Sequence, residues 1–415
     1  MNLADKIKEC LPAELVRLIE AIGAMAAHQD QHLYLVGGAV RDLLLERETF
    51  DLDLAVDGDA ITLAQLLANI TQGRLTVHTR FKTANLRWKE WRTDLTAIRS
   101  ETYDQPGALP RVKPGSLAGD LFRRDFTINA MAVQLSPGHY GDLVDLYGGL
   151  EDLERGFIRV LHEKSFTDDA TRIWRALRYE QRLGFQIEPE TLGLLNRDIA
   201  MLDTISGDRI RHELELVLKE SYPEKVFLRA DELQVLPRLQ PGLKCDSGLS
   251  ERFEQARQIS SPTPPPFSLY LALLTCNLTA DQVEQLIVHL KLPRSLSQIL
   301  RDSCRLNTEI ASLATPSLKP SRIYEVLHGY SPSAITATSL AADSPEASRN
   351  IHQYLTRLRY IKPALTGEDL KSMGLVPGSR ISEILKRLRV ARMDGEVSNR
   401  QEEERLVREW LRKGA

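Results

Sequence analysis

Hydrophobic and polar positions divide the chain into two regions of different pattern. Short runs of aromatic and β-branched residues gather between about residues 33 and 135, in HLYLVGG, FDLDLAV, RLTVHT, ANLRWKE and RTDLTAIRS. Such runs are typical of β-strands. Between the first two, AVRDLLLER places Val40, Leu43 and Leu44 at helical spacing. A strand, a Gly-Gly turn, a helix and a second strand therefore open a mixed α/β domain.

The strand-like runs stop near residue 150, and the pattern from there on predicts helices separated by Pro or Gly breaks such as SSPTPPPFSL. Residues 1–30 are also predicted to be helical. The expected fold class is therefore α+β and multi-domain, with an N-terminal mixed α/β head followed by an all-α remainder. We place the boundaries at a helical segment over 1–30, the head over 31–145, a helical neck over 146–220, and a helical body and tail over 221–415.

Composition changes this picture little. Hydrophobic residues make up 42% and charged residues 27% of the chain, as in ordinary globular proteins. The formal net charge of -3 argues mildly against a nucleic-acid-binding protein. No apolar run approaches the roughly 18 residues of a membrane span, the N-terminus lacks the core of a signal peptide, and the four cysteines form no CxxC pair. We therefore expect no membrane partner and a cytoplasmic protein with reduced thiols.

Two acids in one predicted strand are the first candidate for chemistry. Residues two apart in a strand point to the same face, so FDLDLAV sets the carboxylates of Asp51 and Asp53 side by side. Two close carboxylates repel each other and favour a cation between them. Their oxygen ligands suit Mg²⁺, which also keeps waters and substrate phosphates in its shell. A DxD pattern by itself is weak and also occurs as solvated acids at a strand end.

The surroundings strengthen the metal hypothesis. Upstream, Gly37 and Gly38 form a turn between strand and helix, where backbone N–H groups can approach a triphosphate and the helix N-terminus favours negative charge. Arg41 follows within the first helical turn, placed to pair with phosphate. A third acid, Asp94, lies in RTDLTAIRS. Three carboxylates from two strands would suit a two-metal site for phosphoryl chemistry.

Four motifs in order then resemble a known family. LVGGAVRDLLL with FDLDLAV, DLFRRDFTINAMAV, DLYGGLEDLERGFIRVL and DDATRIWRALRYEQRLGF are similar to the successive motifs of class II tRNA nucleotidyltransferases, the CCA-adding enzymes and their bacterial poly(A) polymerase relatives. The resemblance covers about residues 30–215. It implies a catalytic head over 31–145, a base-reading helix in the neck, and tRNA binding by the body and tail.

The resemblance also implies roles for individual residues. Asp51 and Asp53 would bind the metal, with Asp94 as the third carboxylate. Nucleotide contacts would come from glycine, arginine and aspartate residues of the motifs, with Arg123 assisting: Gly37, Gly38, Arg41, Arg124, Asp125, Asp169, Arg172, Arg175 and Arg178. The motif usually has Glu-Asp-Pro where this chain has Asp168-Asp169-Ala170, which keeps the base-reading Asp169.

The base-reading pair has a physical rationale of its own. On a helix, residues i and i+3 share a face, so Asp169 and Arg172 are expected side by side. A carboxylate only accepts hydrogen bonds and a guanidinium only donates them. Cytosine and adenine each offer an amino donor beside a ring-nitrogen acceptor, whereas uracil and guanine reverse both. Arg178 lies about 180° from Asp169 on such a helix, so it serves either the base or the helix.

The predicted function is Mg²⁺-dependent addition of C and A to the 3′ end of tRNA from CTP and ATP. The tRNA 3′-hydroxyl attacks the α-phosphate in line, and pyrophosphate leaves. The alternatives are an enzyme that adds only A or only CC, a poly(A) polymerase, and a non-catalytic RNA-binding protein on a degenerate scaffold. The Gly- and Pro-rich segment 100–120 is long for an idle connection, which predicts a functional or mobile loop. The resemblance implies a flexible loop near here, part of which CC-only members lack, so the length of this segment disfavours the CC-only alternative. RIRHELELVLK and KRLRVARM are basic candidates for phosphate contacts with the tRNA acceptor arm.

Overall fold

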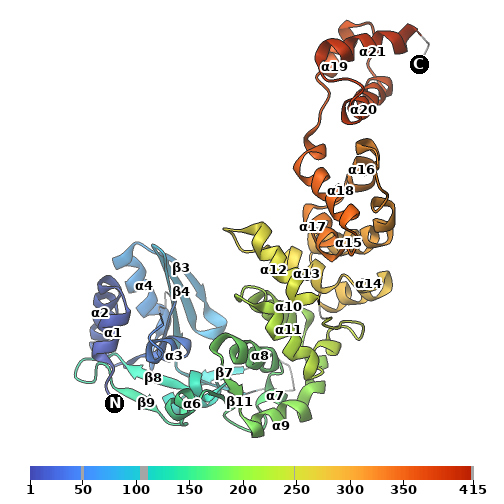
Figure 1. The fold of residues 1–415 in the computed structure, drawn as a ribbon. Helices are drawn as coiled ribbons and strands as arrows, with labels where there is room; N and C mark the ends of the chain where they lie inside the picture. Colours follow the sequence, from blue (N-terminus) through green and yellow to red (C-terminus); the bar gives the residue numbers. More distant parts are fainter. Residues whose placement is uncertain (48–50, 103–110, 247, 413–415) are drawn as a thin grey trace. The chain divides into compact units, whose positions relative to one another are not determined.

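The computed structural model describes residues 1–47, 51–102, 111–246 and 248–412, without the side chains of Asp51, Arg80, Glu101 and Thr102. The chain divides into two compact units, Met1–Glu220 and Ser221–Ala415 (Figure 1). The finer boundaries proposed from the sequence, at residues 30 and 145, stay predictions. In the described ranges, no helix has the length and apolar character that crossing a membrane requires.

A seven-stranded sheet is the centre of the first unit. Its strand order is β3-β4-β5-β2-β1-β8-β9. The strands are β1 (Leu33–Val36), β2 (Asp51–Val56), β3 (Arg74–His78), β4 (Thr83–Trp88), β5 (Trp91–Ala97), β8 (Met131–Gln134) and β9 (Leu143–Asp145). Every neighbouring pair is antiparallel except β2 and β5, which are parallel. The predicted mixed α/β head is confirmed.

Alternation along β2 fixes which side chains leave the core. Leu52, Leu54 and Val56 are buried, so the positions between them face the opposite side of the sheet. Helix α4 (Ala60–Thr71) packs against β3, β4 and β5. It begins at Asp59, whose carboxylate accepts hydrogen bonds from the backbone N–H groups of residues 61 and 62 and caps the helix. The acidic positions of β2 are therefore set by the leucines that anchor the strand.

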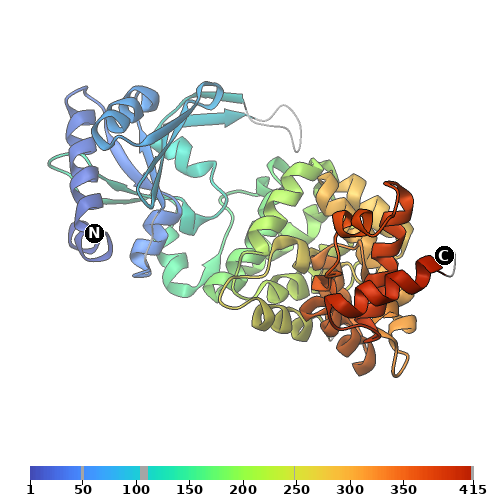
Figure 2. The ribbon, with the colours of Figure 1, turned by 90° about the horizontal axis from the view of Figure 1, so that it is seen from above.

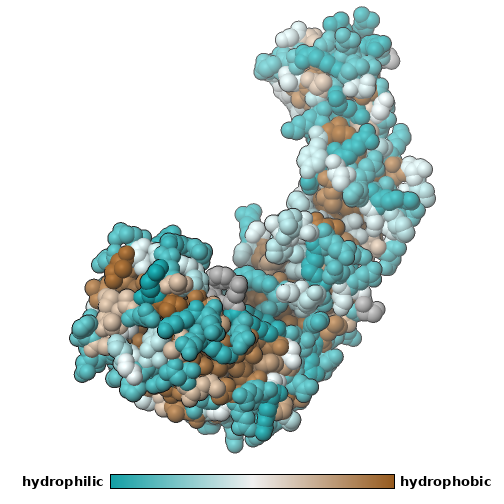
Figure 3. Space-filling model, turned by 60° about the vertical axis from the view of Figure 1, so that its left-hand side comes forward, coloured by the Kyte–Doolittle hydropathy of each residue, from teal (hydrophilic) through white to brown (hydrophobic). Residues whose placement is uncertain are grey.

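Other helices flank the sheet. Helices α1 (Ala4–Cys10) and α2 (Ala13–Ala27) precede it, and α2 packs on β1. Figure 2 shows these N-terminal helices beside the strands. Helix α3 (Gly38–Leu44) lies between β1 and β2, as predicted. On the face seen in Figure 3, the molecular surface is mostly hydrophilic.

The segment predicted as a loop over 100–120 is partly regular. Strands β6 (Arg99–Thr102) and β7 (Arg111–Pro114) form an antiparallel pair, and helix α5 (Leu117–Phe122) follows. The loop prediction is therefore wrong at both ends of the segment. Residues 103–110 lie outside the described residues. The run RTDLTAIRS is likewise divided between β5 and β6.

The neck of the first unit is mainly helical. It contains α6 (Gly149–Arg155), α7 (Ser165–Asp168), α8 (Thr171–Leu183), α9 (Pro189–Asp198) and α10 (Gly207–Val217). Two short strands, β10 (Phe157–Ile158) and β11 (Gln186–Ile187), pair in parallel, which the prediction of helices alone beyond residue 150 missed. Two-residue strands carry too little alternation to be seen in a sequence.

The described part of the second unit consists of helices and connecting segments. The helices are α11 (Pro223–Glu232), α12 (Leu249–Ser260), α13 (Phe267–Leu274), α14 (Ala280–His289), α15 (Arg294–Leu313), α16 (Pro320–Leu327), α17 (Pro332–Ala341), α18 (Pro345–Thr356), α19 (Gly367–Ser372), α20 (Ser379–Met393) and α21 (Arg400–Arg412). One core gathers around Leu306, Ile323 and Ile351. Another gathers around Leu370 and Leu388. The predicted helical remainder is confirmed.

Candidate active site

A glycine turn opens the site between β1 and α3. Gly37 has φ of +72°, a left-handed conformation that residues with a side chain rarely adopt. A Cβ atom there would lie 2.7 Å from Nη1 of Arg124 and 3.4 Å from Oδ2 of Asp53. The absence of a side chain thus lets a strand acid and an arginine approach the same turn. The glycine is required by both its backbone conformation and its surroundings.

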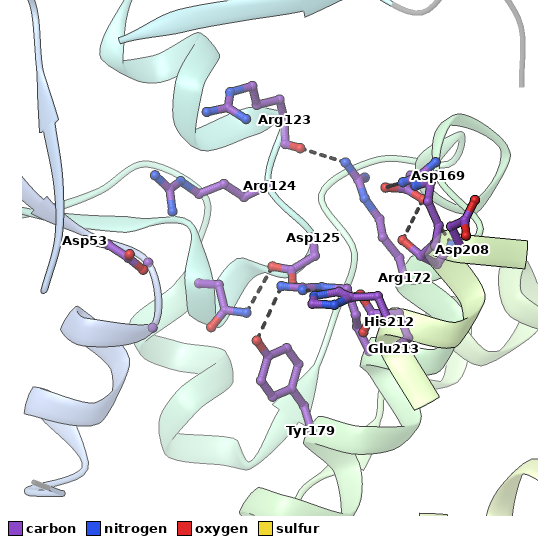
Figure 4. Close-up of a pocket in the computed structure, with 16 residues that line it drawn as sticks. Asp53, Arg123, Arg124, Asp125, Asp169, Arg172, Tyr179, Asp208, His212 and Glu213 are labelled. Carbon is purple, nitrogen blue, oxygen red and sulfur yellow. Dashed lines mark hydrogen bonds and ion pairs between the residues drawn. The ribbon is translucent and has the colours of Figure 1, made fainter. Parts of the chain in front are cut away.

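The turn is part of a pocket of about 660 Å³ that lies wholly within the first unit. Figure 4 shows Asp53 and Arg124 on one side of it and Asp169 and Asp208 on the opposite side. Its lining residues come from the sheet, the α5–β8 segment and the helices of the neck: Gly37, Gly38, Asp53, Arg123, Arg124, Asp125, Asn129, Asp169, Thr171, Arg172, Arg175, Tyr179, Asp208, Arg209, His212 and Glu213.

The acids Asp53 and Asp94 lie on neighbouring strands, as the sequence predicts, and Asp94 also contacts two side chains of the sheet. Asp53 lies directly across from Asp94 in the parallel pair of β2 and β5, so both side chains leave the same face of the sheet. Asp94 forms an ion pair with Arg92 at 3.1 Å and accepts a hydrogen bond from Asn85. Asp51 begins β2, and its side chain lies outside the described residues.

This donor set fits a divalent cation. A carboxylate on the pocket wall supplies the hard oxygen ligand that Mg²⁺ prefers. Asp53 is that carboxylate, and Asp94 lies next to it in the sheet register. Among the side chains that the structure describes, no group of three or more His, Cys, Asp or Glu is arranged to hold a metal ion.

Arg41 is placed differently from its predicted contact with phosphate. Its side chain is buried, with 2% of the residue exposed. The guanidinium donates to both carboxylate oxygens of Asp42, donates to Oδ1 of Asn129 at 2.7 Å, and lies 5.1 Å from the ring centre of Tyr179. Arg41 therefore supports the wall of the pocket from behind, and its direct contact with phosphate stays a prediction.

Asp125 and Arg175 form a buried ion pair in the pocket wall. Nε and Nη2 of Arg175 donate to Oδ2 of Asp125 at 2.8 and 2.6 Å, and Asn129 donates to Oδ1. Burial raises the pKa of Asp125, but the charge of Arg175 and the hydrogen bond from Asn129 outweigh it and lower this pKa to about 2. Asp125 is therefore ionised at neutral pH, and Arg175 is occupied mainly by it.

Arg123 and Arg124 share one buried acid. Arg123 contacts Oδ1 of Asp120 at 2.7 Å and Arg124 contacts Oδ2 at 3.2 Å. Burial raises the pKa of Asp120, and the two arginines more than offset this, so the pKa is lowered. Nε of Arg124 is buried without a hydrogen-bond partner. Since the guanidinium of Arg124 also borders Gly37 and Asp53, it is well placed to face an anion.

Asp169 and Arg172 both line the pocket, but they do not share a helix. Helix α7 ends at Asp168, and Asp169 is extended, with φ of -148°. Oδ1 of Asp169 accepts hydrogen bonds from N and Oγ1 of Thr171, where α8 begins. The aspartate thus lies before the helix that carries Arg172 and accepts hydrogen bonds from its first residue. The expected common face on one helix is therefore wrong, because Asp, with a short acceptor side chain, favours the position before a helix.

Arg172 points from α8 toward the segment before β8. It donates to Oγ of Ser165 and, at 2.7 Å, to the backbone carbonyl of Arg123. Arg178 turns away: it forms an ion pair with Glu220 at 3.3 Å, lies 4.9 Å from the ring centre of Tyr179, and is not among the pocket residues. Of the two roles left open for Arg178, the structure places it with the helix.

Helix α10 contributes a wall that the sequence did not assign to the nucleotide site. Nη2 of Arg209 lies 2.7 Å from Oδ2 of Asp169, and His212 and Glu213 line the same pocket. Burial raises the pKa of Glu213 despite the opposing charge of Arg175, and its Oε2 is buried without a hydrogen-bond partner. RIRHELELVLK was predicted as a surface for RNA phosphate. The signal for a pocket was the i, i+3 and i+4 spacing of Arg209, His212 and Glu213, which puts them on one face.

The fold and the pocket together define a class of protein. A strand acid that can hold a cation lies opposite a group that can read a base, with arginines between them. That is the arrangement needed to bind a nucleoside triphosphate and to act on its phosphates. The site is therefore that of a nucleotidyltransferase.

Comparison with known proteins extends this assignment. Residues 33–159 match the family described as "Poly A polymerase head domain", and residues 184–246 match "Probable RNA and SrmB-binding site of polymerase A". An A-adding tRNA nucleotidyltransferase of Halalkalibacterium halodurans is 31% identical over 99% of this chain and 96% of its own. An A-adding enzyme of Geobacter sulfurreducens is 34% identical over 96% of this chain, which spans about half (47%) of that relative. The chain belongs to the class II tRNA nucleotidyltransferase family.

Solved structures agree with this membership. A CCA-adding enzyme in an apo form is 31% identical with a TM-score of 0.84, over 98% of both chains. The Thermotoga maritima CCA-adding enzyme complexed with tRNA is 29% identical with a TM-score of 0.79, over 99% of both chains. A complex of a CCA-adding enzyme with ATP is 30% identical with a TM-score of 0.82, over 99% of both chains.

Proposed function

We propose that the protein transfers AMP from ATP to the 3′ end of a tRNA that ends in CC. The 3′-oxygen of the tRNA forms a bond to the α-phosphorus, the bond from that phosphorus to the bridging oxygen breaks, and pyrophosphate leaves. The hydroxyl proton passes to solvent or to a neighbouring carboxylate. The observation that carries the proposal is the placement of Asp53 and Asp169 on opposite sides of one pocket, with cationic side chains between them.

Asp169 supplies the preference for a base with an amino group. Its Oδ1 accepts hydrogen bonds from Thr171 and its Oδ2 accepts one from Arg209, yet Oδ2 has a further lone pair that can accept a bond from another donor. The amino group of adenine supplies such a donor, whereas the carbonyl of guanine would repel the carboxylate. Arg172 uses two of its five N–H groups within the protein, which leaves others to donate to the ring nitrogen of the base.

Arg124 and the backbone of Gly37 and Gly38 would contact the triphosphate. Mg²⁺ would be held by Asp53, with Asp51 and Asp94 as its predicted neighbours, and would supply charge neutralisation at the phosphates when bound. Asp125, ionised and paired with Arg175, positions Asn129, which donates to its Oδ1. These residues bind and orient the nucleotide, so that most of the work of the protein is alignment of the two reactants.

Addition of the complete CCA sequence is the second candidate. Two observations favour it: the chain matches CCA-adding structures over nearly its whole length, and the donor and acceptor pattern that suits adenine also suits cytosine. Addition of A alone is placed first because two relatives with that activity are 31% and 34% identical over nearly all of this chain. The segment used to argue against a CC-only enzyme includes residues 103–110, outside the described residues.

One assay separates these candidates. Purified protein is incubated with tRNA transcripts that end before CCA, in C, or in CC, each with a single labelled nucleotide. Incorporation of A into the CC-ended transcript, with no C added to the other two, supports A addition. Incorporation of C into the shorter transcripts overturns A-only addition. It supports the CCA candidate when A is also added to the CC-ended transcript, and a CC-only enzyme when it is not. Absence of any incorporation rejects both, and long A tracts on all three RNAs indicate a poly(A) polymerase.

A further inference from the structure

A second pocket lies in the C-terminal unit, between α16 and α20, and contains about 450 Å³. Three hydrogen bonds link the two sides: Ser321 donates through N and Oγ to Asp394, which directly follows α20, at 2.9 and 2.7 Å, and Nη1 of Arg389 donates to the hydroxyl of Tyr324 at 2.6 Å. The walls are Ser321, Arg322, Tyr324, Glu325, His328, Lys386, Arg389, Val390 and Met393. The pocket is therefore defined by direct contacts between its two sides.

Stacked aromatic rings form one wall. The rings of Tyr324 and His328 lie 4.5 Å apart between centres with an angle of 17°, so they are nearly parallel. Arg389 lies 5.5 Å from the centre of the Tyr324 ring, and Tyr354 supports that ring at 5.9 Å. Tyr324 is thus fixed by its neighbours, while the residue at the end of the stack, His328, is exposed. An exposed ring on a fixed stack offers a flat surface to another planar group.

The opposite wall of the pocket carries an apolar side chain that is exposed to solvent. Val390 is 45% exposed on α20, and Met393 lies one turn further along the same helix. A ligand that covers Val390 and stacks on His328 must be planar and partly apolar. A nucleobase has both properties, and stacking accepts any of the four bases.

The charge around the pocket favours an anion. Helix α20 carries five basic residues, Arg380, Lys386, Arg387, Arg389 and Arg392, against one acid, Glu383. Arg387 lies over the ring of Trp410 and Arg392 pairs with Glu403. Lys386, on the pocket wall, has no ion pair among the side chains that the structure describes. The one acid on the wall, Glu325, is paired with Arg322.

We propose that this pocket binds one unpaired nucleotide of the RNA substrate, with its base against His328 and Val390 and its phosphate beside Lys386. The inference rests on the proposed function for the identity of the RNA and deepens it by adding a contact far along the chain from the nucleotide pocket. The match to the family described as a probable RNA- and SrmB-binding site ends at residue 246, so it does not include this site. The stack and the cationic wall together favour an RNA strand over a protein partner.

The test measures RNA binding by the full chain, without nucleotide, as the fluorescence anisotropy of a labelled tRNA ending in CC. We expect His328→Ala to raise the Kd about fivefold, since base stacking is worth about that factor or more. His328→Phe, which keeps a ring, should bind within about twofold of the unchanged protein. His352→Ala, a change of another exposed histidine in the same unit, is the matched control and should leave the Kd unchanged.

The phosphate contact has its own signature. Lys386→Ala should reduce the slope of log Kd against log salt by about 0.7–0.9, whereas His328→Ala should leave that slope unchanged. Equal Kd values for His328→Ala and the unchanged protein, or equal losses for the Ala and Phe variants, would overturn the proposal, as would a chain that binds no tRNA. Because binding is measured without catalysis, failed A incorporation with the expected binding pattern would reject only the proposed reaction.

Discussion

The ion pair of Asp125 and Arg175 gives a stability prediction whose size follows from the structure. Changing Arg175 to Met keeps an unbranched side chain over Tyr179 but leaves the Asp125 carboxylate, 8% exposed, without its counter-charge. Removing one partner of a buried pair typically costs 3–5 kcal/mol. Arg175 keeps 31% of its side chain exposed to the pocket, so water will replace part of the interaction. We therefore expect a loss of about 3 kcal/mol in the free energy of unfolding of the first unit.

The position of the tryptophans makes this loss measurable in the whole chain. Trp88, Trp91 and Trp174 belong to the first unit, and Trp174 is fully buried beside Arg175 in the sequence, whereas Trp410 belongs to the second. In a Trp410→Phe background, urea unfolding followed by tryptophan fluorescence reports the first unit. The free energy then comes from linear extrapolation to water.

A matched control and a double variant test the reasoning. Arg182→Met alters an exposed arginine on the same helix and should change stability by less than about 0.5 kcal/mol. Asp125→Asn combined with Arg175→Met removes both charges, so it should lose about 1–3 kcal/mol less than the sum of the single changes. A loss below 1 kcal/mol for Arg175→Met, or simple additivity in the double variant, would refute the assignment of a coupled buried pair.

Four further predictions follow from the same pocket. The pKa of Asp125 in the folded protein is about 2, below its ordinary value of 3.8, so the ionised carboxylate contributes about 2 kcal/mol of stability above pH 4 and this contribution is lost as pH falls toward 2. The free energies of unfolding in urea of the unchanged protein and of Asp125→Asn should therefore converge in acid, and a difference that stays constant with pH would contradict this. Gly37→Ala should cost about 1–2 kcal/mol in stability through its left-handed backbone and raise the KM for ATP by displacing Arg124; an unchanged KM would count against that crowding. Asp53→Ala should abolish incorporation of every nucleotide while the Tm stays close to that of the unchanged protein, and retained turnover would reject the metal role. Arg209→Ala should reduce the preference for ATP over GTP by about tenfold, roughly 1.4 kcal/mol, and an equal fall in kcat/KM for both nucleotides would indicate a role in folding only.

The local pattern was enough to predict five of the seven sheet strands, β1 to β5, and the acid on β2, whereas β8 and β9 were not among the predicted runs. Alternation in FDLDLAV both buries Leu52 and Leu54 and exposes the position of Asp53, so one pattern determines the strand and the site. Gly37 was also predicted to line the site, because the Gly-Gly turn is followed by Arg41 and then by the two acids of β2, a conjunction that is rarer than the turn alone. The sequence therefore predicted the side of the pocket nearest the sheet.

The neck side of the pocket depends on contacts that a local pattern does not contain. Asp169 has the right spacing from Arg172 for a shared helix face, yet it lies in the extended segment before the helix that carries Arg172. Arg209 reaches Asp169 from 40 residues away in the chain, a pairing that no local spacing encodes. Arg41 follows the glycine turn as a phosphate ligand would, and only the positions of Asn129 and Tyr179 show that it is buried.

The parallel pairing of β2 with β5 has a consequence for the order in which the site forms. Asp53 and Asp94 are opposite each other although they are 41 positions apart in the chain, with α4, β3 and β4 between them. Closing so long a segment costs conformational entropy before the contacts between the strands can offset it, so pairings between distant strands form slowly in folding. During synthesis, a chain that ends before Ala97 lacks the complete β5. The aligned pair of Asp53 and Asp94 therefore arises only after β5 has joined β2.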